Sequence, residues 1–490
     1  MTQFMSCKNY LLLIGILNTV MMSYNDPGFV TRIGKFEKDM EKCFREHEKH
    51  FGIKPDNSPR LAFNQLQTTF PSFKNIFMFI SNGVRAEAEN SSNEDLNLEE
   101  ELYKYAVWLY LVGSDKDGVK YHNFCHGMFV AYITYEFLSK NTKLNGEPLK
   151  MPEGDKAMYV FAGLFHDAGH PGMGNGIYDI DKKHRENMID HVIKNMEKIL
   201  PNSSDKKEQK EQQQAKVELQ NKINELKNKG ENKFLLENMH RELALMVYNL
   251  VISKYVRPDN YVNPSKKIKV IETQRLQHSH FKQIISNSID RTNMGFPFNS
   301  DQEHVLYRLN HAADLALNGM KDDKLVFLGI EKVYNEFFTE IYHMIRLKGD
   351  EGAAIKTFIQ AGENGDQKKL PKSLQNFVPT AMPPSFNQIF QKQVGFCTNL
   401  ILPHINHFNS YQADVFEYIK TNLVNNTKIF DQKIKNADGS ELVTITANVM
   451  QQIKDEKEFN DPAIVSHLPY FKLSIASVPK NVANNKILLI

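Results

Sequence analysis

The sequence predicts an all-α protein, and two observations carry that prediction. Apolar residues recur at helical spacing from residue 102 onward, and helical patterns continue through residues 128–138 and 157–166. No sustained strand alternation appears before the C-terminal tail, where residues 467–478 have some strand character. The clearest apolar stripe, which we interpret as core, runs beside the only tryptophan, Trp108, and consists of Tyr103, Ala106, Val107, Leu109 and Tyr110.

Composition bounds the class of protein. The 490 residues are 41% hydrophobic and 24% charged, and the formal net charge is +2. Such a balance gives no broad basic surface, so nucleic acid is not an expected partner. The four cysteines lie far apart and form no CxxC pair, which predicts reduced thiols and a cytoplasmic location. They are Cys7, Cys43, Cys125 and Cys397.

The region before residue 100 contains one apolar run, YLLLIGILNTVMM at residues 10–22. This run is too short to cross a bilayer, so no transmembrane span is expected. A docked helix is the favoured interpretation; a membrane-surface helix with a membrane-associated pool, or a cleaved signal peptide, are the alternatives. A charged helical stretch follows at residues 35–51. The acidic segment 86–101 is predicted to be a loop that leads into a helix capped near Ser92 or Asn93.

Residues 165–172, FHDAGHPG, concentrate groups that can bind metals or transfer protons. If the segment is helical, His166 and His170 share one face, and the Pro-Gly pair ends the helix. The segment YHNFCH places His122 and His126 at the same spacing, so a second helix could present two imidazoles. For any single histidine, a hydrogen-bonded core residue at a helix end is the simpler interpretation; the neighbouring groups weaken it.

Asp314 supplies a carboxylate in an apolar helical setting, within the sequence HAAD. Burying such a group is unfavourable unless a metal or another cation compensates its charge. Together with His126, His166 and Asp167 it would form a metal site with two imidazole and two carboxylate ligands. Open positions would remain for water or substrate.

The residues that carry this chemistry follow a known order. The chain resembles the catalytic domain of class I 3′,5′-cyclic nucleotide phosphodiesterases, within the HD-type metallo-phosphohydrolases, and six motifs covering about 275 residues carry the resemblance. They are YHNFCHG at 121–127, HDAGHPGMGN at 166–175, LENMH at 236–240, RTNM at 291–294, HAADLALN at 311–318 and QVGF at 393–396.

The resemblance implies hydrolysis of cAMP or cGMP to the 5′-monophosphate, with two divalent metals, Zn²⁺ and Mg²⁺ or Mn²⁺. Asp167 would bridge the metals, and His122 would be the general acid. The residues expected to orient metal-bound waters and ligands are His170, Glu237, Thr292, Asn123 and His240. The expected substrate contacts are Gln393 and Phe396 at the base, together with Tyr121 and Asn318.

Several positions depart from the family pattern. Met239 replaces a histidine, Asn293 replaces an aspartate, and Gly319 replaces a proline. Leu317 stands where the family has an asparagine three residues after the metal aspartate, and Asn318 comes one position late. None of these changes removes a proposed metal ligand or the proposed acid, so they bear on base recognition and turnover.

The resemblance also implies one compact multi-helix catalytic domain at residues 86–425. An N-terminal helical region occupies residues 1–85, and a C-terminal extension of unassigned role occupies residues 426–490. A charged insertion at about 180–233 contains Leu219, Ile223 and Leu226 at helical spacing, which predicts a protruding surface helix or, alternatively, a helix that binds a protein partner. Residues 349–384 are predicted to form a long loop.

Two other functions remain open at this stage. The chain could be a related HD-type phosphohydrolase that acts on another phosphoester. It could also be a scaffold or cyclic-nucleotide-binding subunit with an impaired site, which would use the insertion or the tail for assembly.

Overall fold

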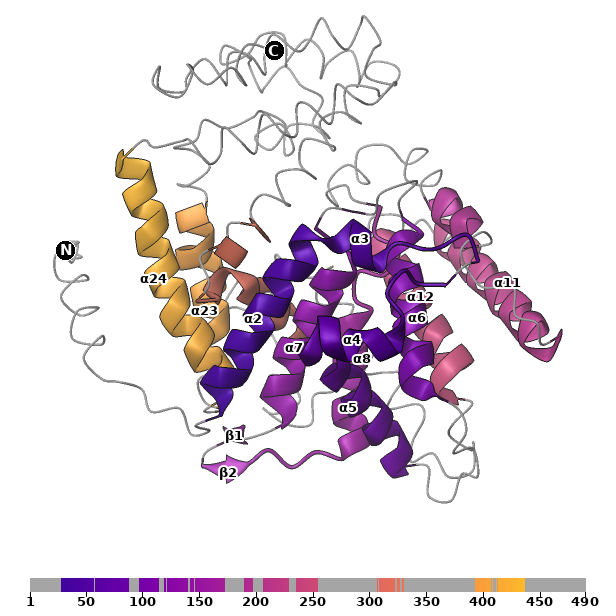
Figure 1. Ribbon diagram of the computed structural model, residues 1–490, viewed down its shortest axis with the longest axis horizontal. Coiled ribbons are helices and arrows are strands. Elements are labelled where there is room, and N and C mark those ends of the chain that lie inside the picture. The colour runs from indigo at the N-terminus through magenta and orange to yellow at the C-terminus, as the bar shows by residue number, and fades with distance from the viewer. Residues whose placement is uncertain are drawn as a thin grey trace, which may run out of the picture.

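We describe the protein from a computed structural model (Figure 1). The residues that the structure describes are 28–56, 58–87, 97–113, 119, 121–139, 142–144, 146–171, 189–196, 206–228, 235–253, 306, 308–321, 324–326, 328–329, 393–406, 408, 411 and 413–436. Several sequence-based predictions lie outside these ranges: the apolar run at 10–22, Ser92 and Asn93, Thr292 and Asn293, the loop at 349–384 and the tail at 467–478.

The described residues form a helical protein, which confirms the predicted fold class. The only strands in these ranges are β1 (Lys143–Leu144) and β2 (Glu147–Pro148), which pair antiparallel. The helical elements are α2 (Phe29–Arg45), α3 (His47–Phe51), α4 (Phe63–Thr69), α5 (Pro71–Glu87), α6 (Leu98–Leu111), α7 (Phe124–Ser139), α8 (Glu153–Leu164), α11 (Lys206–Asn228), α12 (Leu235–Val247), η2 (Tyr248–Ile252), α17 (Leu309–Leu315), η3 (Ala316–Gly319), η6 (Cys397–Ile401), α23 (Leu402–Asn406) and α24 (Asp414–Asn436).

Helix α7 lies at the centre of the fold. Nearly all of its side chains are buried, as expected for a helix that is apolar on every face. It packs on α8, and α8 packs in turn on α5. Gly127 permits the close approach of α7 to α8, because a Cβ atom there would lie 2.6 Å from the carbonyl oxygen of Leu164. The helix that carries His126, a predicted metal ligand, is therefore held in the core.

Helix α6 confirms the predicted core stripe, since Tyr103, Ala106, Val107, Leu109 and Tyr110 are all buried. Its start corrects the sequence-based boundary. The helix begins at Leu98, and Asn97 caps it by accepting a hydrogen bond from the backbone N–H of Glu100. The cap therefore lies four or five residues after the predicted Asn93 or Ser92.

Helix α2 crosses the N-terminal part of the core, and α3 follows it after a break at Glu46. The stretch predicted as helical from residue 35 thus begins earlier and consists of two helices. The ring of Phe36 stacks on that of Tyr132 in α7, with centroids 3.6 Å apart. Arg32 donates two hydrogen bonds, of 3.1 and 3.0 Å, to the carboxylate of Glu136. Apolar packing and a charged pair both join α2 to α7.

Cys43 in α2 and Cys125 in α7 form a disulfide, with Cα atoms 5.9 Å apart. Both residues are buried. The wide sequence spacing of the cysteines predicts reduced thiols, and the structure corrects that prediction for this pair. The spacing could not reveal the pair because α2 and α7 meet only through tertiary packing.

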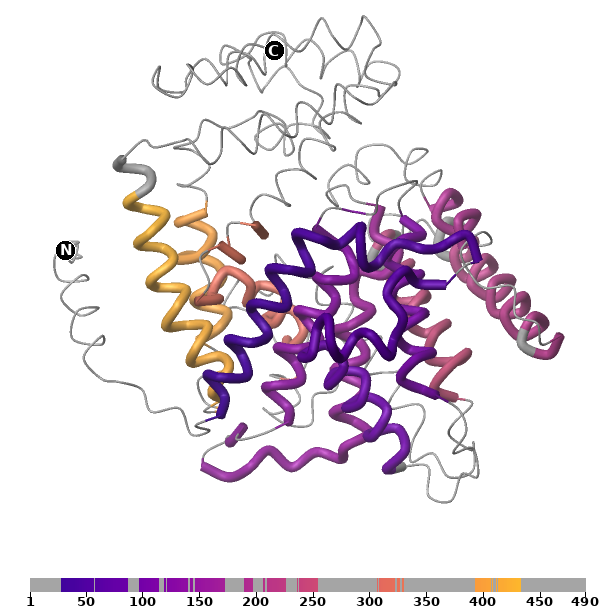
Figure 2. Tube along the Cα trace, viewed as in Figure 1, coloured from indigo at the N-terminus to yellow at the C-terminus, as the bar shows by residue number. Residues whose placement is uncertain are grey.

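Helices α11 and α24 flank the core on opposite sides of the view, as the trace in Figure 2 also shows. Helix α11, from the charged insertion, packs on α12 and η2. Leu219 and Ile223 are buried there, whereas Val217 is 49% exposed. The prediction of a helix in the insertion is confirmed, and the helix has one buried face. None of the helices in the described part of the chain is long and apolar enough to cross a membrane.

Candidate active site

The segment containing His166 and Asp167 forms a turn. Helix α8 ends at Leu164, and Gly169 has a φ of 74°, which a glycine adopts without strain. The prediction that His166 and His170 share a helical face is therefore wrong. The backbone N–H of Gly169 donates to the carbonyl of Leu109 at 2.7 Å, and this bond ties the turn to α6. The turn lets His166 and Asp167 point into the site together.

His126 lies in the first turn of α7, whereas His122 precedes the helix. The prediction of one helix carrying both residues is therefore wrong. Asn123 is buried, and its Oδ1 accepts hydrogen bonds from the backbone N–H groups of Cys125 (3.0 Å) and His126 (3.4 Å). These contacts cap the helix and fix the backbone of His126.

Asp314 lies near the end of α17, which Asn310 connects to two other helices. Thr134 of α7 donates to Asn310 Oδ1 at 2.9 Å, and Asn310 Nδ2 donates to the carbonyl of Tyr159 in α8 at 3.2 Å. Asn310 is itself buried. One amide therefore sets the relative positions of three helices that carry or lead into the four predicted metal ligands.

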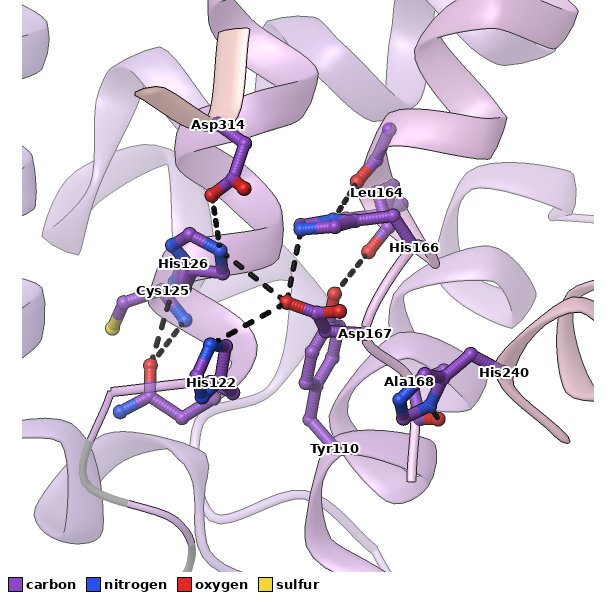
Figure 3. A network of polar contacts seen from close by, with 12 residues as sticks. Tyr110, His122, Cys125, His126, Leu164, His166, Asp167, Ala168, His240 and Asp314 are labelled. Atoms are coloured by element: carbon purple, nitrogen blue, oxygen red, sulfur yellow. Dashed lines mark hydrogen bonds and ion pairs between the residues drawn. The ribbon is translucent and has the colours of Figure 1, made fainter. Parts of the chain in front are cut away.

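The four predicted metal ligands converge, as Figure 3 shows. His126 Nε2 lies 3.1 Å from Asp314 Oδ1 and 3.4 Å from Asp167 Oδ2. His166 Nε2 lies 3.0 Å from Asp167 Oδ2. His126, His166 and Asp167 are buried, and the side chain of Asp314 is 19% exposed. The structure thus brings together residues from α7, the turn after α8 and α17.

Backbone contacts fix the orientation of two histidines around this cluster. His166 Nδ1 donates to the carbonyl of Gly163 at 2.8 Å, which directs its Nε2 toward Asp167. His240 Nδ1, from α12, donates to the carbonyl of Ala168 at 2.5 Å. Such bonds hold a metal-binding imidazole in one tautomer and one ring orientation.

The site has strong internal electrostatics. Burial disfavours the protonated form of His126, but Asp167 and Asp314 outweigh that effect and raise its pKa to about 9. Burial also raises the pKa of Asp167, yet His166, His126 and His122 overcome burial and hold that pKa well below the usual range. Imidazole and carboxylate thus interact as opposite charges when no metal is bound.

The donor set fits a divalent metal. Three nitrogen–oxygen pairs among the two imidazoles and two carboxylates lie 3.0–3.4 Å apart, and these are ligand types that zinc accepts. For His126, His166 and Asp167 the ligand atoms all lie within 4.8 Å of one another. A cation between these three residues would replace the charge of the proton on His126 and compensate the carboxylate of Asp167.

His122 and His170 lie beside this cluster with their rings stacked, centroids 4.0 Å apart. The His170 ring is in turn nearly parallel to that of His240, at 5.5 Å. His122 Nε2 lies 4.0 Å from Asp167 Oδ2, and its side chain is 26% exposed. Tyr121 packs its ring against His122 and His126, at 4.9 and 4.6 Å. His122 is therefore held beside the ligands and remains open to solvent.

Gln393 and Phe396 occupy a helical turn that leads into η6. Gln393 Nε2 donates to Asn318 Oδ1 at 2.6 Å and to Cys397 Sγ at 3.5 Å, and Phe396 is 38% exposed. Leu317 is buried in the core. Asn318, one position later on the 3₁₀ turn of η3, is the residue that lies beside Gln393.

The structure does not describe the side chains of two predicted site residues. Thr292 lies outside the described residues, and for Glu237 only its place in α12 is described. The sequence reasoning missed other residues that shape the site: Asn310, Gly127, Gly169 and Asn426. A buried asparagine in an apolar helix, such as Asn310, was the available signal, since a buried amide requires hydrogen-bond partners.

Fold and site together define an all-α protein with a histidine–aspartate centre suited to a divalent metal. Residues 121–199 match the family model described as 3′5′-cyclic nucleotide phosphodiesterase. This segment contains His122, His126, His166 and Asp167. The match shows that this part of the chain is similar to 3′5′-cyclic nucleotide phosphodiesterases, as the motifs predict.

Two phosphodiesterases are among the solved structures to which the chain is similar. The chain is similar to the yeast phosphodiesterase caPDE2, at 13% identity and a TM-score of 0.43, over 87% of this chain and 73% of that one. It is also similar to the phosphodiesterase domain of the RhoPDE fusion protein from the choanoflagellate Salpingoeca rosetta. That similarity has 13% identity and a TM-score of 0.44, over 76% of this chain and 92% of that one. No curated protein matches the sequence.

Proposed function

We propose that this protein hydrolyses 3′,5′-cyclic purine nucleotides, cAMP, cGMP or both, to the 5′-monophosphates, and so ends cyclic nucleotide signals. The observation that carries the proposal is the convergence of His126, His166, Asp167 and Asp314 beside the partly exposed His122. The family match over residues 121–199 supports it independently.

Two divalent metals, Zn²⁺ and Mg²⁺ or Mn²⁺, fit this reaction. His126, His166, Asp167 and Asp314 would hold the first, and Asp167 would also contact the second. When bound, the metals supply charge neutralisation at the phosphoryl oxygens and an activated water nucleophile. His170, His240, Glu237 and Thr292 are the proposed residues that orient water molecules around the metals.

His122 is the proposed general acid. Its ring lies against His170 and near Asp167, yet a quarter of its side chain is exposed, so it can reach a substrate outside the ligand cluster. A proton from His122 to the departing 3′ oxygen would neutralise the developing alkoxide. The stacking on His170 limits the rotation of the His122 ring and holds it in position.

Base recognition falls to Gln393 and Phe396. A partly exposed aromatic ring can stack on a purine, and an amide can pair with the base edge. One amide beside largely apolar surroundings gives modest discrimination, about 10–200-fold, between cAMP and cGMP. A preference above about 10⁴ would require further polar contacts to the base.

The test measures release of 5′-AMP and 5′-GMP by the purified chain with added Mg²⁺, with and without a chelator. Bis(p-nitrophenyl) phosphate, which has no base, serves as a general phosphodiester. We expect both cyclic nucleotides to be cleaved and the chelator to stop the reaction. Turnover of the general substrate alone would favour another phosphoester as the natural substrate, and binding of nucleotide without turnover would favour a scaffold.

Asp314→Asn provides the matching variant, because it keeps the shape of the side chain and removes its charge. We expect it to lose turnover and bound zinc together, since one of two carboxylate ligands is gone. Asp56→Asn is the control, because Asp56 is on the surface, where it bonds Ser58. Normal zinc content and normal hydrolysis in Asp314→Asn would remove Asp314 from the metal site.

A further inference from the structure

Helix α24 lies against the turn that follows the metal-site aspartate. That turn, η3, continues α17 and ends at Gly319. A Cβ atom on Gly319 would lie 2.5 Å from the carbonyl oxygen of Ile419 in α24. Only glycine allows this approach without displacing backbone, which gives a physical reason for Gly319 at this position.

Asn426 of α24 bonds to both sides of that glycine. Its Nδ2 donates to the carbonyl of Asn318 and to the carbonyl of Met320, each at 2.8 Å. Both hydrogens of the amide are thus used, and the side chain is buried, with 4% exposure. Two short bonds from one buried group restrict the backbone on either side of Gly319.

The restricted turn carries Asn318, whose own amide is fixed as well. Asn318 Nδ2 donates to the carbonyl of Leu315 at 3.1 Å, so Asn318 Oδ1 is the atom left to accept from Gln393 Nε2. A continuous chain of hydrogen bonds therefore runs from Asn426 through Asn318 to Gln393. It connects a helix that carries none of the predicted motif residues to the amide proposed to contact the base.

We propose that Asn426 is a positioning residue for nucleotide binding, acting by fixing the η3 turn and, through Asn318, the amide of Gln393. The proposal rests on the proposed function, because it assigns Gln393 to the base. Helix α24 would then help to position the substrate-binding residues. This helix spans the expected boundary between the catalytic domain and the C-terminal extension.

The test compares Asn426→Ala with Asn422→Ala. Asn422 is a matched control, since it lies one turn earlier on α24, is 9% exposed and has a side-chain nitrogen with no hydrogen bond among the described residues. We expect Asn426→Ala to raise KM for the cyclic nucleotide about three- to tenfold while kcat and zinc content stay unchanged. Asn422→Ala should change none of these values, nor should either variant alter turnover of bis(p-nitrophenyl) phosphate.

A double-mutant cycle separates positioning from a general structural effect. In a Gln393→Ala background, Asn426→Ala should add no further rise in KM, because the group through which it acts is gone. An equal rise in KM in both backgrounds would overturn the proposal. Loss of zinc, or a lower kcat toward bis(p-nitrophenyl) phosphate, would also overturn it, because either result would place the effect of Asn426→Ala at Asp314.

Hydrogen exchange tests whether Asn426 fixes the η3 turn and Gln393, and this test does not require cleavage of a cyclic nucleotide. Asn426→Ala should increase deuterium uptake in peptides that cover residues 315–321 and 393–401, and Asn422→Ala should not. Unchanged uptake in both segments would sink the proposal. Absence of cyclic nucleotide hydrolysis by the unmodified chain would instead count against the proposed function.

Discussion

Thr134 donates a 2.9 Å hydrogen bond to Asn310 across 176 residues of sequence, inside the buried junction of α7 and α17. Asn310 also bonds the carbonyl of Tyr159. This pair of contacts fixes the helix of Asp314 relative to the helix of His126. The geometry of the candidate metal site therefore depends on an amide outside the four predicted ligands.

Replacing Asn310 by leucine should lower both stability and metal affinity. The change leaves the Thr134 hydroxyl and the Tyr159 carbonyl without this partner, and each buried group left unsatisfied costs about 1–3 kcal/mol. Urea unfolding and competitive zinc titration would measure the two effects. Thr134→Val should cost less, since it removes one bond and keeps the side-chain shape.

The control for this pair is Thr427→Val, because the Thr427 hydroxyl bonds the carbonyl of Leu423 in its own helix and the Cys397 thiol, and neither is a predicted metal ligand. It should leave zinc affinity unchanged. If Asn310→Leu unfolds more easily but binds zinc as tightly as the unmodified protein, the amide stabilises the fold without setting the metal site.

Metal binding should release a proton from His126. Its pKa of about 9 in the folded, metal-free protein means that the imidazole is protonated at pH 7, whereas a metal ligand must be neutral. Zinc affinity should therefore rise about tenfold per pH unit from pH 7 toward pH 9 and level off above that. Asp167 adds no proton, because its pKa is held well below the usual range.

Calorimetric titration of zinc in two buffers with different ionisation enthalpies measures that proton directly. His311 should not contribute to the count, since burial lowers its pKa to about 4 and it is already neutral at pH 7. Zinc binding near pH 7.5 with no proton release would show that the His126 imidazole is neutral before the metal arrives.

The sequence selected residues that the structure brings together, but it did not predict their local structure. Residue type and order were enough to choose His126, His166, Asp167 and Asp314 as candidate ligands, because metal binding requires particular ligand types. The turn at Gly169 and the helix start at Phe124 were missed, since both FHDAGH and YHNFCH also fit helical spacing. Asn318, which the sequence places one position later than the family pattern, lies on the 3₁₀ turn of η3 and accepts a hydrogen bond from Gln393.

The disulfide and the hydrogen bonds of Asn310 and Asn426 could not be predicted from the sequence. Each joins segments that are distant in sequence, and neither spacing nor periodicity records which helices pack together. Cys43 and Cys125, for example, are 82 residues apart. Tertiary packing determines such contacts, so a single sequence provides candidates but no pairing.

Substituting His122 by alanine should preserve metal occupancy and lower kcat about 10²–10⁴-fold, the range expected for loss of a positioned general acid. Its Nε2 is 4.0 Å from Asp167 Oδ2, farther than the nitrogen atoms of His126 and His166. Comparison of a cyclic nucleotide with a substrate that has a better leaving group provides the test, since the latter needs less protonation. Equal slowing of both substrates together with zinc loss would make His122 a ligand.

Deleting residues 204–229, with a short Gly-Ser bridge, should leave hydrolysis largely intact but lower stability. Helix α11 buries Leu219 and Ile223 against α12, and removing each large apolar side chain from such a contact loses about 1.5–3 kcal/mol. Thermal unfolding and kcat/KM measure the two effects. The point variants Ile223→Ala and Val217→Ala separate the loss of buried contacts from the loss of the helix as a whole. Only Ile223 is buried, so only Ile223→Ala should lower stability. A folded, zinc-containing deletion without activity would show that α11 shapes the substrate site.

Loss of the Cys43–Cys125 disulfide should destabilise the fold by about 4–5 kcal/mol, the chain-entropy value for a crosslink that closes a loop of 82 residues. Both cysteines are buried, so reductant should act during unfolding. Thermal scans with and without reductant should therefore differ for the unmodified chain. For Cys43→Ala, the scans with and without reductant should coincide at the unfolding temperature of the reduced protein, since this variant has no crosslink to lose.

Intact-mass measurement after alkylation would show whether Cys43 and Cys125 react only in the reduced, unfolded chain. Alkylation of both thiols without reductant, together with identical scans, would show that the pair is reduced in the purified protein.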